Sequence, residues 1–487
     1  MALMTRRECL RKSLLAVAGT GVAAMVPRSA RGQVVGANDV IRVGMAGLRL
    51  RGTELIDWFR KVPGVRIVAL CDCDTQFFER HLKTLGDTPD KVATVQDFRR
   101  LLDDKNLDAV VIATPNHWHA LMTVWACQAG KDVYVEKPIS HNIREGRQMV
   151  AAASKYNRIV QSGTQNRSDV GLKAAAQFLR GGGLGAIRLA RVFDLAQRQP
   201  IGKTEGPQPV PPTANYDLFQ GPAPLVPLRR KNLHYDWHFV WATGSGDCGN
   251  RGVHCLDHAR WMTGRETLPE RVLTIAGRLG WDDDGETPNA HVTFFDCQPV
   301  PILYELTNLV PDKPAKPGTG FPCGPTSMKI ECQGGTLTGG RGGATAFDTK
   351  GKIIQHFKGD SGVTHAANFI AAVRARKPEV LEADVHKGHI SSALCHLANV
   401  SYLVGQRQPP QKIRDAIRGN AVLGESFERL ASLLQANQVD LDKTPLTLGP
   451  LLAFDPQKEQ FTGEGAEQAN AYLSRAYRPP FVVPGNV

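Results

Sequence analysis

Short apolar stretches alternate with segments of helical periodicity in the first third of the chain. Strands are expected at residues 40–46, 65–70, 107–113 and 131–135, where β-branched and other apolar residues follow one another. Between the first two, residues 53–59 place apolar side chains at helical spacing. Strands that alternate with helices predict an α/β fold built on a doubly wound parallel sheet.

The rest of the chain follows a different pattern. Residues 199–232 and 308–326 are rich in Pro and Gly and are expected to be long loops, which usually serve a function or an interface. Residues 455–487 show no recognisable chemistry. A chain of 487 residues is too long for one core, so about two domains are expected. Helical periodicity returns at 366–376, 390–404 and 414–438.

The N-terminus has the layout of an export signal. Paired arginines, Arg6 and Arg7, precede a modestly apolar stretch at 13–26 and a region of small residues. This order favours a twin-arginine signal peptide over residues 1–32, with a disordered basic arm as the alternative. We therefore expect an exported, periplasmic protein whose mature chain starts near Gln33.

Charge and cysteine content narrow the functional class. Removing residues 1–32 takes away six Lys/Arg and one Glu and lowers the net charge from +12 to +7. No stripe of clustered Lys and Arg is present, so nucleic acid is not an expected partner. No apolar run reaches the ~18 to 20 residues of a membrane helix. The ten cysteines show no spacing typical of a disulfide framework or a metal knuckle.

A glycine-containing turn follows the first strand. In the dinucleotide fingerprint G-x-G-x-x-G, Gly47 and Gly52 fill the first and third glycine positions and Arg49 stands at the second. Asp72 comes twenty residues after Gly52, where an acidic side chain binds ribose hydroxyls and favours NAD; an ordinary turn residue is the alternative. Arg49 and Arg51 keep NADP open, since either could bind a 2′-phosphate.

Polar residues also follow the third and fourth expected strands. One group begins at Thr114, and the other is Glu136-Lys137-Pro138. Ligands of open α/β sheets bind beyond the carboxyl ends of strands, so both groups are expected near the cofactor. A lysine there can donate a proton or stabilise a negatively charged oxygen; a solvated surface lysine is the alternative.

These motifs together resemble the Gfo/Idh/MocA oxidoreductase family, and most of all its exported, twin-arginine-bearing branch. The resemblance spans roughly residues 38–450. The motifs that carry it are Gly47-x-x-x-x-Gly52, Cys71-Asp72, Ala113-Thr114-Pro115-Asn116-x-x-His119, Glu136-Lys137-Pro138, Gly163-Thr164-Gln165-Asn166-Arg167-Ser168, the run from Gly246 to His254, and the helix around 365–374.

The resemblance implies three parts after the signal. These are a dinucleotide-binding Rossmann domain at 38–160, a substrate and oligomerisation α+β domain with a largely antiparallel open sheet at 161–410, and a C-terminal helical segment and tail at 411–487. It implies hydride transfer to or from a secondary alcohol carbon of a sugar, inositol or related polyol. NAD is the expected cofactor, NADP the alternative, and a homo-oligomer the expected assembly.

In the family, proton transfer involves the lysine of the Glu-Lys-Pro motif and a histidine of the second domain, here Lys137 and His254. A neutral imidazole, with a pKa near ~6.5, is a suitable base. The aspartate that often stands four residues before this histidine is Asn250 here, and Asp247 could supply the missing charge. His254 and His258, at i and i+4, could instead be structural or bind a metal, but the zincin glutamate is absent and no metal site is predicted.

The candidate residues fall into two further groups. The expected substrate residues are Arg167, Trp237, His238 and Trp241, since aromatic rings stack on the apolar faces of sugars; a core or interface role is the alternative for these rings. The expected cofactor-binding residues are Gly47, Arg49, Arg51, Gly52, Asp72, Thr114, Pro115, Asn116, His119, Glu136, Lys137 and Gln165.

Other functions remain open at this level. Free NAD is scarce outside the cytoplasm, so NAD could stay tightly bound and be recycled within one catalytic cycle, which includes redox-assisted glycoside cleavage. A catalytically inactive carbohydrate-binding Rossmann protein is another alternative, favoured by Arg49 and Asn250. A zinc-dependent hydrolase is a more distant one.

Overall fold

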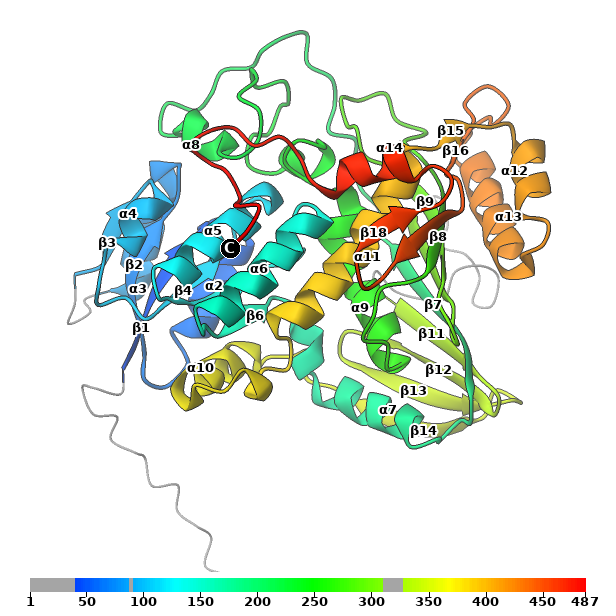
Figure 1. The fold of residues 1–487 in the computed structure, drawn as a ribbon, viewed down its shortest axis with the longest axis horizontal. Helices are drawn as coiled ribbons and strands as arrows, with labels where there is room; N and C mark the ends of the chain where they lie inside the picture. Colours follow the sequence, from blue (N-terminus) through cyan, green and yellow to red (C-terminus); the bar gives the residue numbers. More distant parts are fainter. Residues whose placement is uncertain (1–39, 87–90, 310–326) are drawn as a thin grey trace, which may run out of the picture. The chain divides into compact units, whose positions relative to one another are not determined.

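The computed structural model describes residues 40–86, 91–309 and 327–487, and the expected parallel sheet lies in its first part (Figure 1). All its strand pairs are parallel, in the order β3-β2-β1-β4-β5-β6, which is that of a Rossmann fold. The predicted signal at 1–32 lies outside the described residues. The strands are β1 (Ile41–Ala46), β2 (Val65–Cys71), β3 (Ala93–Val95), β4 (Ala109–Ile112), β5 (Asp132–Val135) and β6 (Val160–Ser162).

Helices cover both faces of this sheet because its strands are apolar on both sides. Along β4, Ala109 and Val111 belong to one core, whereas Val110 and Ile112 belong to the other. The connecting helices are α2 (Arg51–Phe59), α3 (Phe78–Leu85), α4 (Phe98–Leu102), α5 (Asn116–Gln128) and α6 (Ile143–Lys155). The doubly wound sheet predicted from the alternating pattern is confirmed.

The second sheet is largely antiparallel, as expected. Its strand path runs β14-β13-β12-β11-β7-β10-β9-β8-β16-β15; in addition, β17 pairs with β8, and β18 pairs with β17. Among the described strands of this second sheet, only β7 and β10 pair in parallel. The strands are β7 (Ile187–Leu195), β8 (Arg271–Gly277), β9 (Ala290–Asp296), β10 (Ile302–Thr307), β11 (Ser327–Cys332), β12 (Gly335–Gly340), β13 (Gly343–Asp348), β14 (Ile353–Lys358), β15 (Gln406–Arg407), β16 (Thr447–Leu448), β17 (Leu452–Asp455) and β18 (Gln460–Thr462).

Helices pack on the two faces of the second sheet through separate apolar clusters. On β10, Tyr304 joins the cluster shared with α7, α9 and α11, and Leu303 joins the cluster shared with α12 and α13. The helices are α7 (Val170–Arg180), α8 (Tyr216–Gln220), α9 (Val253–Met262), α10 (His365–Ala375), α11 (Val385–Leu403), α12 (Pro410–Ile417), α13 (Ala421–Ala436) and α14 (Ala466–Asn470). None of the described helices combines the length and apolar character that a membrane crossing needs.

The domains are more interleaved along the sequence than the expected boundaries suggest. Strand β6 runs across the expected boundary after residue 160 and belongs to the parallel sheet. Helix α10 lies within the expected second domain, yet Phe369 and Ile370 pack into the core of the first sheet beside Phe59. The eight cysteines of the described chain are all free.

The C-terminal tail, residues 474–487, returns to the first domain. Figure 1 shows it in red, running from α14 past α8 to α5. Arg478 bonds Asp217 at 2.7 Å, beside α8. Phe481 is 2% exposed and packs edge-on against Trp118 of α5, with ring centroids 5.3 Å apart. The last residues therefore complete the apolar core on this side of the parallel sheet.

This packing predicts a matched pair of effects. Phe481→Ala should lower the free energy of unfolding by about 3 to 5 kcal/mol, because it empties a closed aromatic site. Val482→Ala, at a neighbour that is 44% exposed, should change it by less than about 0.5 kcal/mol. Urea unfolding of the two variants measures both values; equal effects would show that the tail is not part of the core.

Candidate cofactor and substrate site

A cavity lies beyond the carboxyl ends of β1, β2, β4 and β5. Its floor comes from the loops after these strands, including Gly47, Asp72, Thr114 and Lys137. This is the edge where the strand order reverses between β1 and β4, the usual ligand site of such sheets. Its other wall comes from residues 213–243, here called the roof segment, which contributes Leu218, Phe219, His234, Tyr235, Trp237 and His238.

The turn after β1 has the backbone of a dinucleotide-binding loop. Gly47 has φ +82°, and a Cβ there would lie 2.5 Å from the carbonyl oxygen of Ala113, so a side chain is excluded. Gly52 lies inside α2 and packs against the carbonyl of Gly47, as expected for the third glycine. Arg49 is tolerated in the second position because its Nη1 reaches the carbonyl oxygen of His234 in the roof segment, at 2.9 Å.

Asp72 marks the adenosine end of the cavity. Its carboxylate accepts hydrogen bonds from the backbone N–H groups of Leu48 (2.8 Å) and Asp74 (3.0 Å). Burial raises the pKa of Asp72 to about 6, although these two hydrogen bonds oppose the shift. Asp97 lines the same end, so two carboxylates face the place where a 2′-phosphate would bind. This charge favours NAD over NADP.

Arg51 lines the cavity and is paired with Glu136, which follows β5. Its Nε bonds Glu136 at 2.7 Å and its Nη1 bonds Glu54 at 2.8 Å, while the guanidinium covers the ring of Trp58. Its charge is therefore matched by carboxylates, which makes it a poor ligand for the 2′-phosphate that the sequence left open. Gly163 makes room for this pair, since a Cβ there would lie 2.7 Å from the carboxyl group of Glu136.

Lys137 joins the two domains at the floor of the cavity. Its Nζ donates to the backbone oxygen of Asn250 at 2.7 Å and lies 3.4 Å from Asn250 Oδ1. Asn250 Nδ2 in turn donates to Asp247 at 3.1 Å, and Arg198 binds both oxygens of that carboxylate at 2.9 Å. Burial lowers the pKa of Lys137, and the carboxylate of Glu136 partly offsets this. Asp247 thus orients Asn250, and its charge is balanced by Arg198.

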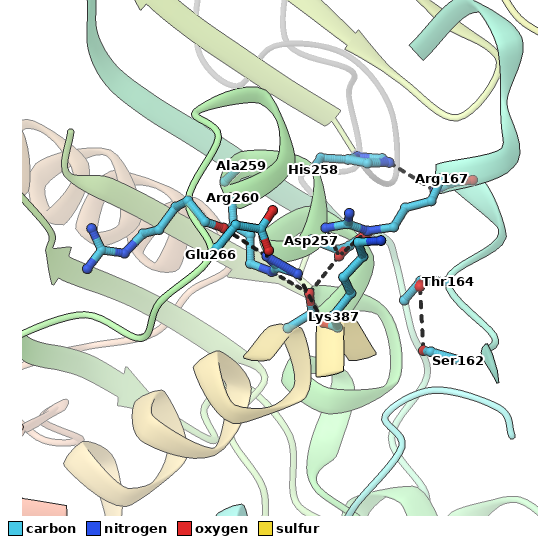
Figure 2. A network of polar contacts seen from close by, with 12 residues as sticks. Ser162, Thr164, Arg167, Asp257, His258, Ala259, Arg260, Glu266 and Lys387 are labelled. Carbon is cyan, nitrogen blue, oxygen red and sulfur yellow. Dashed lines mark hydrogen bonds and ion pairs between the residues drawn. The ribbon is translucent and has the colours of Figure 1, made fainter. Parts of the chain in front are cut away.

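Several expected site residues lie elsewhere. Figure 2 shows Arg167 directed at Asp257; its Nε lies 2.9 Å from both carboxylate oxygens, and both side chains are buried. The expected substrate role of Arg167 is therefore replaced by an ion pair between the turn after β6 and α9. Trp241 lies outside the cavity lining and contacts Tyr402, with ring centroids 6.3 Å apart. Gln165 is buried outside the lining as well.

The two histidines of α9 do not form a metal site in the described chain. Asn166 Nδ2 donates to His258 Nε2 at 3.0 Å, which occupies the lone pair that a metal would need. No group of three or more His, Cys, Asp or Glu side chains in the described ranges is arranged to hold a metal ion. His254 does not line the cavity, and its buried Nδ1 has no hydrogen-bond partner among the described residues.

His119, Trp237 and Phe219 also line the cavity, and of these three only Phe219 was not anticipated from the sequence. His119 was expected to contact the cofactor, and its ring lies between the carbonyl oxygens of Thr114 (2.8 Å) and Pro138 (2.7 Å), so it also braces two floor loops. The aromatic run that contains Trp237 signalled the roof segment. Phe219 had no such signal, because it lies in a stretch that reads as a loop.

Two family models match the chain. "Oxidoreductase family, NAD-binding Rossmann fold" matches residues 41–164, and "Oxidoreductase family, C-terminal alpha/beta domain" matches residues 193–292. The chain belongs to the Gfo/Idh/MocA oxidoreductase family. Membership confirms the expected family, and its NAD-binding first domain confirms the expected nicotinamide cofactor.

Curated relatives match over part of the chain. A "Glycosyl hydrolase family 109 protein 2" of Shewanella sp. (strain ANA-3) is 34% identical over 171 residues, which cover 31% of this chain and 38% of the relative. A "Glycosyl hydrolase family 109 protein" of Saccharopolyspora erythraea is 34% identical over 172 residues, covering 32% and 38%. The chain thus spans little more than a third of the length of these curated relatives.

Solved structures share the fold over most of the chain. The WlbA dehydrogenase of Bordetella pertussis, in complex with NADH and UDP-GlcNAcA, has a TM-score of 0.55 at 19% identity and covers 74% of this chain and 95% of its own. An aldose-aldose oxidoreductase of Caulobacter crescentus, complexed with glycerol, has a TM-score of 0.56 at 16% identity, covering 74% and 97%. Both share the fold of this chain over about three quarters of its length.

The raised pKa of Asp72 predicts how NADH binding responds to pH. The carboxylate is charged above its pKa of about 6 and gains a proton as the pH falls through that value, so it then accepts ribose hydrogen bonds less well. NADH affinity should therefore fall from about pH 7 to about pH 5. Asp72→Asn should bind NADH about 10- to 100-fold more weakly, with no such pH dependence.

Fluorescence titration with NADH measures both effects. The exposed Asp103 supplies the matched control, because Asp103→Asn removes a carboxylate from α4 without touching the cavity. That variant should follow the wild-type pH curve. A flat curve in the wild type would contradict the role given to Asp72.

Proposed function

We propose that this protein transfers hydride between NAD and a secondary alcohol carbon of a sugar, inositol or related polyol. The observation that carries the proposal is the position of Lys137, on the wall of a cavity whose other end has the glycine turn and the carboxylate of a nucleotide site. Gly47 leaves room for the cofactor backbone, and Asp72 suits a ribose. When bound, NAD supplies the hydride acceptor or donor.

Lys137 would hold the substrate oxygen. An ammonium has three donors, and Asn250 accepts two of them, at its backbone oxygen (2.7 Å) and at Oδ1 (3.4 Å), so one donor remains for a hydroxyl or carbonyl oxygen. A positive charge there stabilises the negative charge that develops on that oxygen. Glu136, itself paired with Arg51, lies next in sequence and favours the charged form of Lys137 against the effect of burial. This intact arrangement supports an enzyme over an inactive binding protein.

Sugar substrates are supported by the aromatic side of the cavity and by the relatives. Trp237 and Tyr235 line the roof, where a ring can stack on the apolar face of a sugar. The WlbA dehydrogenase binds UDP-GlcNAcA, and the Caulobacter crescentus protein is named an aldose-aldose oxidoreductase.

Replacing Lys137 tests this proposal. Lys137→Ala should lower the rate of NADH formation from a panel of aldoses, N-acetylhexosamines and inositols by about 100-fold or more, because the charge that holds the substrate oxygen is lost. NADH affinity should stay near the wild-type value. Lys350→Ala, in an exposed turn between β13 and β14, is the control and should keep full activity. Unchanged turnover in the Lys137 variant would contradict the proposal.

A second candidate is supported by the roof segment. Four hydrogen bonds hold the roof segment against the Rossmann domain. They run from Thr75 N–H to Thr213 O (3.1 Å), from Asn215 N–H to Cys73 O (2.8 Å), between His234 and Asp74 (2.8 Å), and from Trp118 of α5 to Leu218 O (3.0 Å). These contacts hold the roof segment over the cavity in which a nucleotide would bind. This favours a retained NAD that is reduced and reoxidised within one cycle, as redox-assisted glycoside cleavage requires, and relatives named glycosyl hydrolases support that reaction.

Nucleotide retention distinguishes the two candidates. Under the second one, NAD(H) should copurify with the protein, survive extensive dialysis, and appear in the supernatant after acid denaturation. His234→Ala removes the contact with Asp74 and should release most of it, while His386→Ala, at an exposed site on α11, should not. Protein that is free of nucleotide and exchanges NAD rapidly would rule out the second candidate and leave the first.

A further inference from the structure

The oxidation of an alcohol also needs an acceptor for the hydroxyl proton. Asn250 stands at the position of the expected aspartate, and a neutral amide is a negligible base. Asp247 is close by, but Arg198 binds both of its oxygens, and the amide groups of Asn250 and Asn308 also donate to it. Burial alone would raise the pKa of Asp247, yet Arg198 holds it below its usual value. Asp247 is therefore a fully engaged anion.

We propose that His238 accepts this proton while Lys137 holds the same oxygen. The inference rests on the proposed function and deepens it by naming a catalytic residue. His238 belongs to the short 3-10 helix Asp236–Phe239 of the roof segment and lines the cavity that Lys137 also lines. The two residues line the same cavity, and the charge of Lys137 is close enough to act on the imidazole, so an oxygen held by Lys137 can lie beside His238.

Hydrogen bonding fixes the tautomer of His238. Its Nδ1 lies 2.7 Å from the carbonyl oxygen of Tyr235, and a carbonyl can only accept, so Nδ1 carries the hydrogen. Nε2 then carries the lone pair. Among the described residues, the hydrogen bond to Tyr235 is the only one that the His238 ring makes. The imidazole also lies against Trp237, with ring centroids 3.6 Å apart and planes at 21°, which restrains its orientation.

Other ionisable groups on the described wall already have partners. His254, the histidine that the resemblance implies, is close enough to Lys137 for that charge to lower its pKa further, but it does not line this cavity. Asp72 lies at the adenosine end. Glu136 is paired with Arg51, His234 with Asp74, and His119 lies between two carbonyl oxygens. His238 is thus the described wall residue that combines a basic lone pair with a position near Lys137.

The protonation state suits the role. Burial lowers the pKa of His238 to about 4, with the charge of Asp247 opposing the shift and that of Lys137 adding to it. The imidazole is therefore neutral at pH 7. A weak base suffices, because the hydroxyl proton becomes much more acidic as hydride leaves the carbon, and the ammonium of Lys137 on the same oxygen raises that acidity further.

The step balances in atoms and charge. The C–H bond breaks and its hydrogen leaves with both electrons for the nicotinamide of NAD, so the carbon is oxidised and the cofactor reduced. The O–H bond breaks, its electron pair completes the carbonyl, and the proton passes to Nε2 of His238. Asp247 lies close enough to influence the imidazole and stabilises the imidazolium that forms.

First-turnover kinetics test the assignment on the full-length protein loaded with NAD. His238→Gln should slow NADH formation from those panel sugars that the wild type oxidises by about 100-fold or more. NADH affinity should change little, which shows that the roof segment is intact. In His238→Ala, added imidazole should restore part of the rate. His356→Gln, on the exposed strand β14, is the matched control and should react like the wild type.

The outcomes separate this inference from the proposed function. If the wild type oxidises no sugar of the panel and reduces none with NADH, the proposed function fails and the inference fails with it. If the wild type is active and His238→Gln keeps its rate, the inference alone is overturned. A loss of rate in His254→Gln without a loss in His238→Gln would return the role to His254.

Discussion

Glu136 is a carboxylate buried at the end of β5, and an unpaired charge at this depth would cost several kcal/mol. Arg51, at the start of α2, supplies the partner at 2.7 Å. This pair ties the end of β5 to the start of α2, and Gly163 leaves the space that the pair occupies. Lys137 follows Glu136 directly, so this pair also fixes its position, and its side chain bonds Asn250 of the second domain. The cavity floor thus depends on one matched pair of buried charges.

Local pattern was enough to predict the parallel sheet. The strands expected at 40–46 and 65–70 correspond to β1 and β2, because strands buried on both faces leave continuous apolar runs in the sequence. The domain boundaries could not be read in this way. Phe369 and Phe481 complete the first domain from distant parts of the chain, and nothing in their neighbourhood shows which core they join.

Site residues were predictable where a strand positions them. Asp72 and Lys137 lie at strand ends, so topology alone brings them to one edge of the sheet. The roof segment does not follow a strand of the parallel sheet. Hydrogen bonds between loops hold it in place, so that Phe219 and His238 line the cavity. The resemblance points to His254 because a motif records position along the chain, and it carries no information on where the roof segment lies.

The C-terminal tail has a consequence for the order of folding. A Rossmann domain at the start of a chain can usually fold during synthesis, while the rest is still being translated. Here one side of its core remains open until Phe481, far along the chain from α5, has been made and docks. Until then the newly made protein exposes Trp118 and its apolar neighbours. Chaperones that bind apolar segments therefore have a defined target on this chain, which is buried when the tail docks.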